Sequence, residues 1–297
     1  MSIGSRRSRE SEGEPRATAA ASCLVSAICD HKLWDASELL GKVLGWVGVS
    51  VDSRGLLQLE GLTKAFGGLL AVSRVSFDVA EGEILGLLGP NGSGKTTLLN
   101  LVAGALRADA GRVRLAGRDI TSRPASVRTR LGIARTFQLV RPLSKMSALD
   151  NVLVARLYGR DAPAFTAARE QSLQLLDLIG IRGKADAPTA HLTLVERKRV
   201  EIARALATQP RVLLLDEPLA GLNPTEVGAA LNIFRRIRDS GITVVLVEHN
   251  VRAVRALCHR LIVLNYGQNV AQGAPDDVLQ RPEVVEAYLG KAPADFQ

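Results

Sequence analysis

The sequence predicts an α/β fold built on a mainly parallel sheet. Two apolar runs, Val212–Leu215 and Ile242–Val247, are separated by a helical pattern from Thr225 to Asp239. Continuous apolar runs that alternate with helices are typical of parallel strands buried on both faces. A third run, Glu83–Leu88, leads into a glycine-rich loop and then a helical pattern over Thr97–Gly104. With 297 residues, 46% of them hydrophobic, the chain is long enough to bury such a core.

The region before the glycine-rich loop has the alternating pattern of antiparallel strands. Leu57–Glu60 and Val72–Val79 alternate apolar and polar residues, and Gly67-Gly68 marks a turn between them. Beyond the loop and its helix, Arg112–Leu115 and Leu131–Thr136 are predicted to be short strands. The expected α/β fold therefore combines a parallel core with a separate antiparallel part.

Residues 145–207 are predicted to be mainly helical, because their apolar positions recur at the spacing of one helix face. These positions are Leu173, Leu176, Leu178 and Ile179. Towards the end of the chain, the pattern predicts a strand at Leu261–Leu264, a turn at Tyr266-Gly267 and a last helix at Pro275–Leu289.

The N-terminal region differs from the rest in composition. Residues 1–22 are polar and without periodicity, which predicts disorder. Residues 23–50 are more apolar, and Glu38–Val47 has the pattern of a short amphipathic helix. The alternatives are a poorly ordered appendage and a surface helix that touches a membrane or a partner. The expected organisation is an appendage at 1–54 and one domain at 55–297, with a helical subdomain at about 140–208.

Composition and charge exclude several classes of protein. The formal net charge is +8, yet only 4% of the residues are aromatic, so the stacking platforms that bases need are scarce. We therefore expect no nucleic-acid partner. The most apolar stretch, Leu33–Val51, is interrupted by Asp35, Glu38 and Lys42, so no run reaches the roughly 18–20 residues of a membrane-spanning helix.

The cysteines and the N-terminus predict a cytosolic protein. Cys23, Cys29 and Cys258 form neither a CxxC pair nor an even framework, which fits a reducing compartment. Arg6 and Arg7 are followed by acidic residues rather than by an apolar segment, which argues against an export signal.

The glycine-rich loop carries the strongest functional signal. The spacing G-x-x-x-x-G-K-[ST] of a phosphate-binding loop (P-loop) matches between a predicted strand and a predicted helix, which disfavours a purely structural turn. Backbone N–H groups and the helix N-terminus would surround the phosphates, Lys95 would reach the β and γ phosphates, and Thr96 would offer its hydroxyl to Mg²⁺. The expected ATP contacts are Gly89, Pro90, Asn91, Gly92, Ser93, Gly94, Lys95, Thr96 and Thr97.

Two adjacent carboxylates follow the apolar run Val212–Leu215. Asp216 and Glu217 stand at the carboxyl end of a predicted strand, where α/β sheets bind their ligands. We expect Asp216 to hold Mg²⁺ and Glu217 to act as the general base on the attacking water. The alternative is a solvated strand end.

The order of four motifs resembles the ATP-binding subunit of an ABC transporter. They are the P-loop, Thr136-Phe137-Gln138, Asp216-Glu217-Pro218 and Glu248-His249, and the similarity covers residues 56–290. Further segments resemble the branched-chain amino acid importer subgroup. They are Gly67-Gly68-Leu69, Ala134–Gln138, Glu201–Leu206, Ala220–Pro224 and Glu286–Gly290.

The resemblance implies a P-loop NTPase fold of the ABC-cassette type, an ATPase activity, and ATP and Mg²⁺ as cofactors. It also implies two cassettes, identical or different, that meet head to tail, so that each ATP lies between one copy's P-loop and the other copy's signature segment. Hydrolysis would drive import through separate permease subunits on the membrane, with the cassette at its cytoplasmic side and a solute-binding protein as a further partner. The implied solute is a branched-chain amino acid or a related solute.

The resemblance also assigns roles to three side chains. Phe66 matches the aromatic residue that stacks on adenine, whereas a lone aromatic is more often part of a core. Gln138 matches the catalytic-site glutamine that senses Mg²⁺ and the attacking water, and it lies where the membrane subunit docks. His249 matches the switch histidine that contacts the γ-phosphate, and its alternative is a surface imidazole.

One motif departs from the family pattern. Family members carry Leu-Ser-Gly-Gly-Gln before a helix, where this chain has Leu192–Glu196. Thr193 keeps a hydroxyl group and Val195 keeps a backbone N–H, so both are candidate contacts to the partner cassette's ATP. However, the β-branched Val195 replaces a glycine where the γ-phosphate must approach the backbone closely. Two hypotheses stay open: an energising ATPase of an importer, and a nucleotide-binding regulatory subunit that hydrolyses ATP weakly.

Overall fold

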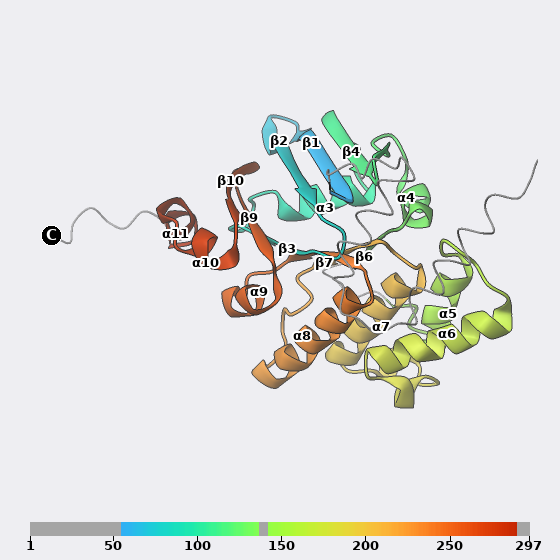
Figure 1. Ribbon diagram of the computed structural model, residues 1–297. Helices are drawn as coiled ribbons and strands as arrows, with labels where there is room; N and C mark the ends of the chain where they lie inside the picture. The colour runs from blue at the N-terminus through green and yellow to red at the C-terminus, as the bar shows by residue number, and fades with distance from the viewer. Residues whose placement is uncertain (1–54, 137–141, 290–297) are drawn as a thin grey trace, which may run out of the picture. The chain divides into compact units, whose positions relative to one another are not determined.

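The computed structural model describes residues 55–136 and 142–289, and its elements carry the labels of Figure 1. The expectations for residues 1–54 and for Gln138 lie outside the described residues. The strands are β1 (Leu57–Phe66), β2 (Leu69–Val79), β3 (Ile84–Leu88), β4 (Ala110–Leu115), β5 (Arg118–Asp119), β6 (Ile133–Arg135), β7 (Val212–Asp216), β8 (Thr243–Val247), β9 (Arg260–Asn265) and β10 (Gln268–Gly273). The helices are α3 (Lys95–Ala103), α4 (Ala125–Leu131), α5 (Ala148–Leu157), α6 (Phe165–Leu178), α7 (Leu194–Ala207), α8 (Pro224–Asp239), α9 (Val251–Leu257), α10 (Pro275–Leu279) and α11 (Pro282–Leu289), with 3-10 turns at Arg182–Lys184 and Thr189–His191.

The central sheet has the strand order β10-β9-β3-β8-β7-β6. Its strands β9, β3, β8, β7 and β6 are parallel, and β10 is added antiparallel at one edge. The apolar runs Val212–Leu215 and Ile242–Val247 form the neighbouring strands β7 and β8. The prediction of an α/β fold with a mainly parallel sheet is confirmed.

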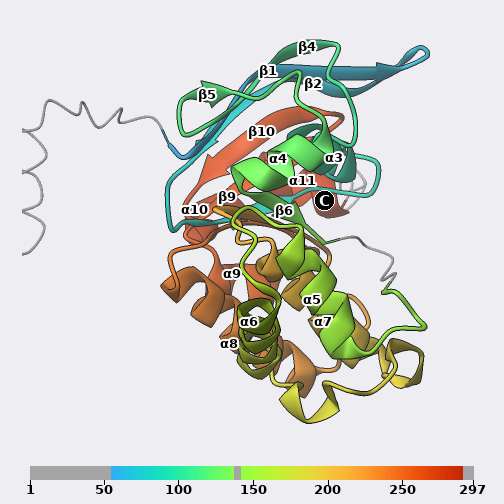
Figure 2. The ribbon, with the colours of Figure 1, turned by 90° about the vertical axis from the view of Figure 1, so that its right-hand side faces the viewer.

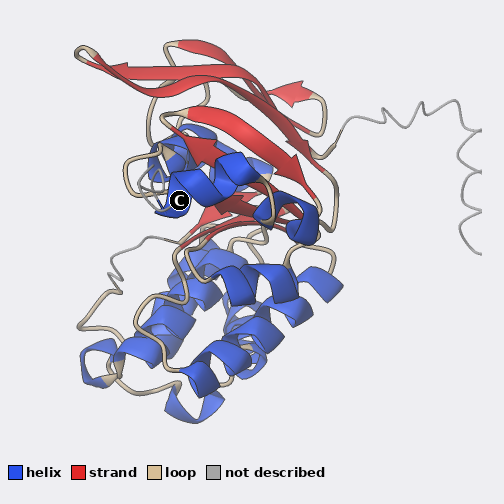
Figure 3. Ribbon diagram, turned by 90° about the vertical axis from the view of Figure 1, so that its left-hand side faces the viewer, coloured by secondary structure: helices blue, strands red, loops and turns tan. Residues whose placement is uncertain are grey.

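A second sheet is antiparallel, with the order β2-β1-β4-β5. The hairpin β1–β2 turns at Gly67-Gly68, where Gly67 has a φ of 56° that favours glycine. The predicted antiparallel part is therefore present. Figure 2 shows it as a separate layer, with α3 and α4 between the two sheets and α5 to α9 on the other face of the central sheet. Figure 3 shows the same layers of strands and helices from the opposite side.

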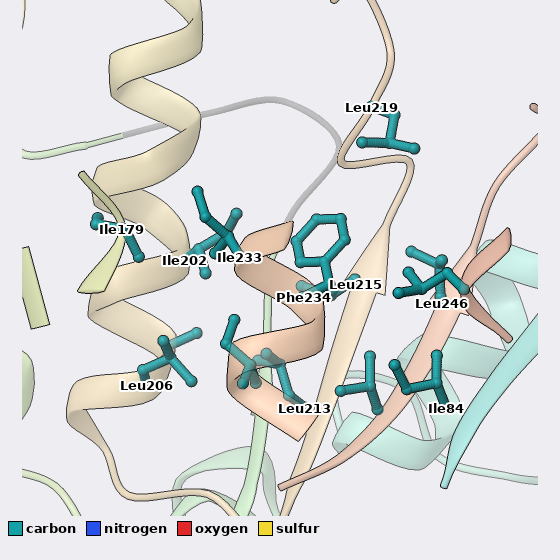
Figure 4. Close-up of a cluster of buried hydrophobic side chains, with 14 of the residues drawn as sticks. Ile84, Ile179, Ile202, Leu206, Leu213, Leu215, Leu219, Ile233, Phe234 and Leu246 are labelled. Atoms are coloured by element: carbon teal, nitrogen blue, oxygen red, sulfur yellow. The ribbon is translucent and has the colours of Figure 1, made fainter. Parts of the chain in front are cut away.

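Alternation along the central strands divides the interior into two cores. Leu85 and Leu87 of β3 face the core shared with β1, β2, β4 and α3, whereas Ile84 and Leu88 face the core under α5 to α9. Figure 4 shows part of the latter core, where the buried Phe234 of α8 lies beside Leu215 of β7. Because both faces of the sheet are covered, its inner strands β3, β7 and β8 are buried along their whole length and are almost entirely apolar.

The expected last helix is two helices in the structure. A single helix over Pro275–Leu289 was wrong, because α10 ends at Leu279 and α11 begins at Pro282. Proline has no N–H to donate and disfavours helical geometry in the residue before it, so it starts a helix more readily than it continues one. The strand expected to start at Leu131 also begins later, because Leu131 closes α4 and Gly132, with a φ of 109°, ends that helix.

Candidate functional site

Several predicted site residues lie at one edge of the central sheet. The P-loop follows β3, Asp216 and Glu217 close β7, and His249 comes shortly after β8. β8 pairs with both β3 and β7 in parallel, so the carboxyl ends of the three strands meet at this edge. The crevice outside such strand ends is where open α/β sheets bind their ligands.

The P-loop packs closely against both sheets. At Gly94, whose φ is 100°, a Cβ would lie 2.3 Å from the carbonyl oxygen of Ala71 in β2. At Gly89, whose φ is 147°, a Cβ would lie 2.1 Å from the carbonyl oxygen of Leu264 in β9. These approaches exclude any side chain at either position and set the path of the loop.

Helix α3 begins directly at Lys95, with Gly94 as its N-cap. Among the described residues, no side chain caps this end of the helix, so its first N–H groups are available to an anion. Thr96 is exposed in the first turn, and Thr97 beside it is half-buried. The arrangement fits a phosphate group at the start of α3.

The side chain of Lys95 folds back onto the P-loop. Its Nζ donates to the carbonyl oxygens of Gly89 at 2.7 Å and of Pro90 at 2.8 Å, and the residue is buried. Burial lowers the pKa of Lys95, and the charges of Glu217 and Asp216 act in the opposite direction. Asn91 and Gly92, in the middle of the loop, are exposed to solvent. Ser93 is buried, and its hydroxyl oxygen has no hydrogen-bond partner among the described residues.

Asp216 forms a buried ion pair that the sequence analysis did not identify. Its Oδ2 accepts a hydrogen bond from Nη2 of Arg135 in β6 at 2.9 Å, and Arg135 Nη1 donates to Oδ1 of Asn100 in α3. The other carboxylate oxygen, Oδ1, is buried and has no hydrogen-bond partner in the described part of the chain. An unpartnered oxygen of a buried carboxylate is suited to a hard cation such as Mg²⁺.

The structure brings the side chains of Glu217 and His249 together. His249 Nε2 lies 2.7 Å from Glu217 Oε1, and both side chains are partly accessible to solvent. Glu217 has a φ of 50°, and its N–H donates to the carbonyl oxygen of Val247 at the end of β8. The backbone at Glu217 thus leaves strand geometry directly after β7, at the residue whose carboxylate contacts His249.

The loop that follows Glu217 is held by a residue of α7. Lys198 Nζ donates to the carbonyl oxygens of Ala220 at 2.6 Å and of Pro218 at 3.1 Å. Burial lowers the pKa of Lys198, whereas the nearby acidic residues raise it. Lys198 and Arg135 were not predicted as site residues, because each reaches the site through a long-range tertiary contact that no local sequence motif indicates.

A protein-family model described as "ABC transporter" matches residues 72–220. The high-affinity branched-chain amino acid transport ATP-binding protein BraF of Pseudomonas aeruginosa is 37% identical over 254 residues, which is 81% of this chain and 100% of that protein. This chain belongs to the ABC transporter family. It is an ATP-binding cassette and an ATPase of that family.

Of two further relatives of the cassette, one has the same named function as BraF and the other has a different one. The probable branched-chain amino acid transport ATP-binding protein LivG of Archaeoglobus fulgidus is 36% identical, over 82% of this chain and 98% of that protein. The lipopolysaccharide export system ATP-binding protein LptB of Acidithiobacillus ferridurans is 40% identical, over 79% and 97% respectively.

Solved cassettes share the fold. The crystal structure of the ADP conformation of MJ1267, an ATP-binding cassette of an ABC transporter, matches with a TM-score of 0.73 and 32% identity, over 80% of this chain and 100% of that one. The dimeric cassette MJ0796 matches with a TM-score of 0.68 and 26% identity, over 74% and 98%. Within the described residues, the cassette has no helix with the length and apolarity of a membrane span.

Phe66 of the cassette lies at the end of β1 and is 46% exposed, so it is not a core residue. Lys64 Nζ lies 5.6 Å from the centroid of its ring. An exposed aromatic face of this kind is available for stacking.

Thr193 and Val195 lie at the start of α7. Thr193 is the N-cap and forms a reciprocal capping box with Glu196, whose carboxylate also pairs with Lys184 at 2.5 Å. Leu194 beside them is 47% exposed. The divergent signature segment thus begins α7 with a complete capping box, in which the Glu196 carboxylate accepts from the backbone N–H of Thr193.

Proposed function

We propose that this cassette is the energising subunit of an importer for branched-chain amino acids or a related solute. It would act through separate permease subunits at the cytoplasmic side of the membrane, with a solute-binding protein as a further partner. BraF and LivG, which are named as branched-chain amino acid transport proteins and match over four-fifths of the chain, support this solute class. LptB, an export protein, gives the competing assignment.

The observation that carries the hydrolytic part of the proposal is the contact between Glu217 and His249 at the edge of the central sheet where the P-loop also begins. In this proposal Glu217 takes a proton from the attacking water, while His249 orients that carboxylate and contacts the γ-phosphate. Lys95 supplies positive charge to the phosphates. Because a candidate general base and a histidine that contacts it are both present, the site favours an ATPase over a weakly hydrolysing regulatory subunit.

Mg²⁺ would be held by Thr96, Asp216 and Gln138 together with phosphate oxygens, and it would neutralise charge on the phosphates. Among the described residues, no cluster of three His, Cys, Asp or Glu side chains forms a metal cage. A site with few protein ligands suits Mg²⁺, which keeps substrate phosphates and water in its shell. The unpartnered Oδ1 of Asp216 is the described atom that fits this role best.

A second cassette, identical or different, would complete the site. Thr193 and Val195 would then face the ATP bound to that partner's P-loop. The dimeric structure of MJ0796 supports this association.

Co-purification tests the transport assignment. The full chain is co-expressed with candidate permease subunits of importers and of exporters, extracted from membranes, and the attached chains are identified by mass spectrometry. We expect importer permeases, and ATP turnover in proteoliposomes that rises when leucine-loaded binding protein is added. Association with exporter permeases alone, or a chain that stays wholly unattached, would contradict the proposal.

Replacing Phe66 with Ala should weaken ATP binding about tenfold, because one base–aromatic stacking contact is lost. Phe66→Trp should restore the affinity. Leu69→Ala is the matched control, since Leu69 is 70% exposed and pairs with Phe66 across the hairpin. A fluorescent ATP analogue measures the dissociation constants, and an unchanged constant in Phe66→Ala would remove the stacking role.

Replacing Val195 with Gly tests whether the divergent signature segment limits hydrolysis. We expect turnover by the assembled transporter to change by less than about threefold, because the capping box remains and glycine costs only about 1 kcal/mol in a helix. Val195→Ala separates the effect of side-chain bulk from that of glycine. A gain of about tenfold or more would instead support the weakly hydrolysing regulatory subunit.

A further inference from the structure

Glu248 has no role in the proposed mechanism, yet it directly precedes His249 and contacts the loop that follows Glu217. It follows β8 directly and is 3% exposed. A buried carboxylate is costly unless hydrogen bonds replace its water. Its partners therefore show what the fold uses it for.

Each oxygen of Glu248 accepts a hydrogen bond from the backbone of a different loop. Oε1 accepts from the N–H of Leu219 at 2.7 Å, in the loop after β7. Oε2 accepts from the N–H of His249 at 3.2 Å, in the loop after β8. Burial raises the pKa of Glu248, and the N–H donors, including that of Asn250, lower it.

These two loops also carry the reacting pair. Leu219 is two residues from Glu217, and His249 is the neighbour of Glu248. The segment after β7 is thus joined to the end of β8 and its loop by the Glu248 carboxylate, by the contact of 2.7 Å between Glu217 and His249, and by the N–H of Glu217 on the carbonyl oxygen of Val247. Lys198 holds the carbonyl side of the first loop, so its position is determined from both sides.

A glutamine of the same shape cannot make both backbone contacts. Its amide has one acceptor oxygen, and its NH₂ group would face a second N–H donor. A carboxylate is therefore the side chain of this size that accepts from both loops at once.

We propose that Glu248 is a positioning residue for ATP hydrolysis, which holds the Glu217 loop and the His249 loop at the separation that their contact requires. The inference rests on the proposed roles of Glu217 and His249. It adds a residue outside the P-loop whose loss should slow the chemical step and spare nucleotide binding.

The test compares Glu248→Gln with the unaltered full chain in steady-state ATP hydrolysis over a range of ATP concentrations. We expect kcat to fall about 10- to 100-fold, since small misplacement of catalytic groups has effects of this size. The KM for ATP should stay within about twofold, because the P-loop is untouched. If Glu248→Gln does not fold, Glu248→Asp, which keeps the charge on a shorter side chain, is measured by the same criteria.

A double-mutant cycle with His249→Ala separates positioning from general structural support. If Glu248 acts through the Glu217–His249 contact, adding Glu248→Gln to His249→Ala should slow hydrolysis by no more than about twofold further. Glu83→Gln is the matched control. Glu83 is a largely buried carboxylate that pairs with Arg260 and accepts from the N–H of Ala80 at the opposite edge of the same sheet. It should leave kcat unchanged.

The inference is overturned if Glu248→Gln keeps normal kcat, if its effect is additive with that of His249→Ala, or if KM rises in proportion. Comparison with Glu217→Gln shows whether the proposed roles of Glu217 and His249 or only the positioning role of Glu248 is wrong. Normal turnover in Glu217→Gln removes the proposed roles of the pair, whereas a silent Glu217→Gln beside a fully active Glu248→Gln removes the positioning role alone.

Discussion

Glu217→Gln should reduce ATP turnover about 10³-fold, the size expected when a general base is lost. Glutamine keeps the shape of the side chain and can still approach His249, but it cannot accept a proton from water. ATP binding should persist, because Lys95 and the loop N–H groups are unaltered. Turnover is measured at saturating ATP, and affinity is measured with a fluorescent ATP analogue.

The control is Glu170→Gln, on the exposed face of α6. This substitution also removes one negative charge, but Glu170 lies on α6 and not at the ends of the central strands. Both turnover and affinity should therefore stay at the wild-type values. Wild-type turnover in Glu217→Gln would show that another group activates the water, and loss of affinity would assign Glu217 to nucleotide binding instead.

Arg128→Met should lower the free energy of unfolding by about 3–5 kcal/mol, a range typical of breaking a buried hydrogen-bond network and leaving several acceptors without donors. Arg128 is 2% exposed. Its guanidinium donates to the carbonyl oxygens of Leu101 at 2.6 Å and Val102 at 2.8 Å, in the last turn of α3, and of Thr121 at 2.7 Å and Arg123 at 2.9 Å. Methionine would leave these buried acceptors without donors.

Thermal unfolding followed by circular dichroism should show the melting temperature falling by about 10 °C. Arg130→Met is the matched control, since Arg130 is exposed on the same helix, and it should change stability by less than about 0.5 kcal/mol. A loss below about 1 kcal/mol in Arg128→Met would mean that water replaces the guanidinium at these carbonyls.

The P-loop and the carboxylate pair could be predicted because each is a short motif next to a regular element. An apolar strand followed by Asp216 and Glu217 places both carboxylates at a sheet edge without knowledge of the sheet's order. The same logic placed His249 at the end of β8. Parallel strands end at one edge of their sheet, so a motif at each strand end is enough to predict their meeting.

Phe66 and the signature segment were predicted less completely. The choice between a core position and a ligand contact for Phe66 depended on exposure, which strand periodicity at the end of β1 does not report. At Thr193, the capping box with Glu196 has a sequence signature, but the pairing of Glu196 with Lys184 depends on where the 3-10 turn before α7 lies.

The sequence alone was sufficient for the α/β class and the two kinds of sheet, and it proposed the P-loop and the carboxylate pair as site residues, since these depend on local periodicity and spacing. The candidate roles of His249 and Gln138 came from the family resemblance. Only the tertiary structure revealed the partners of the proposed site residues: Arg135 on Asp216, Lys198 on the loop after Glu217, and Glu248 between two loops. The physical reason is that these contacts join segments 19 to 81 residues apart, largely through backbone groups that every residue possesses.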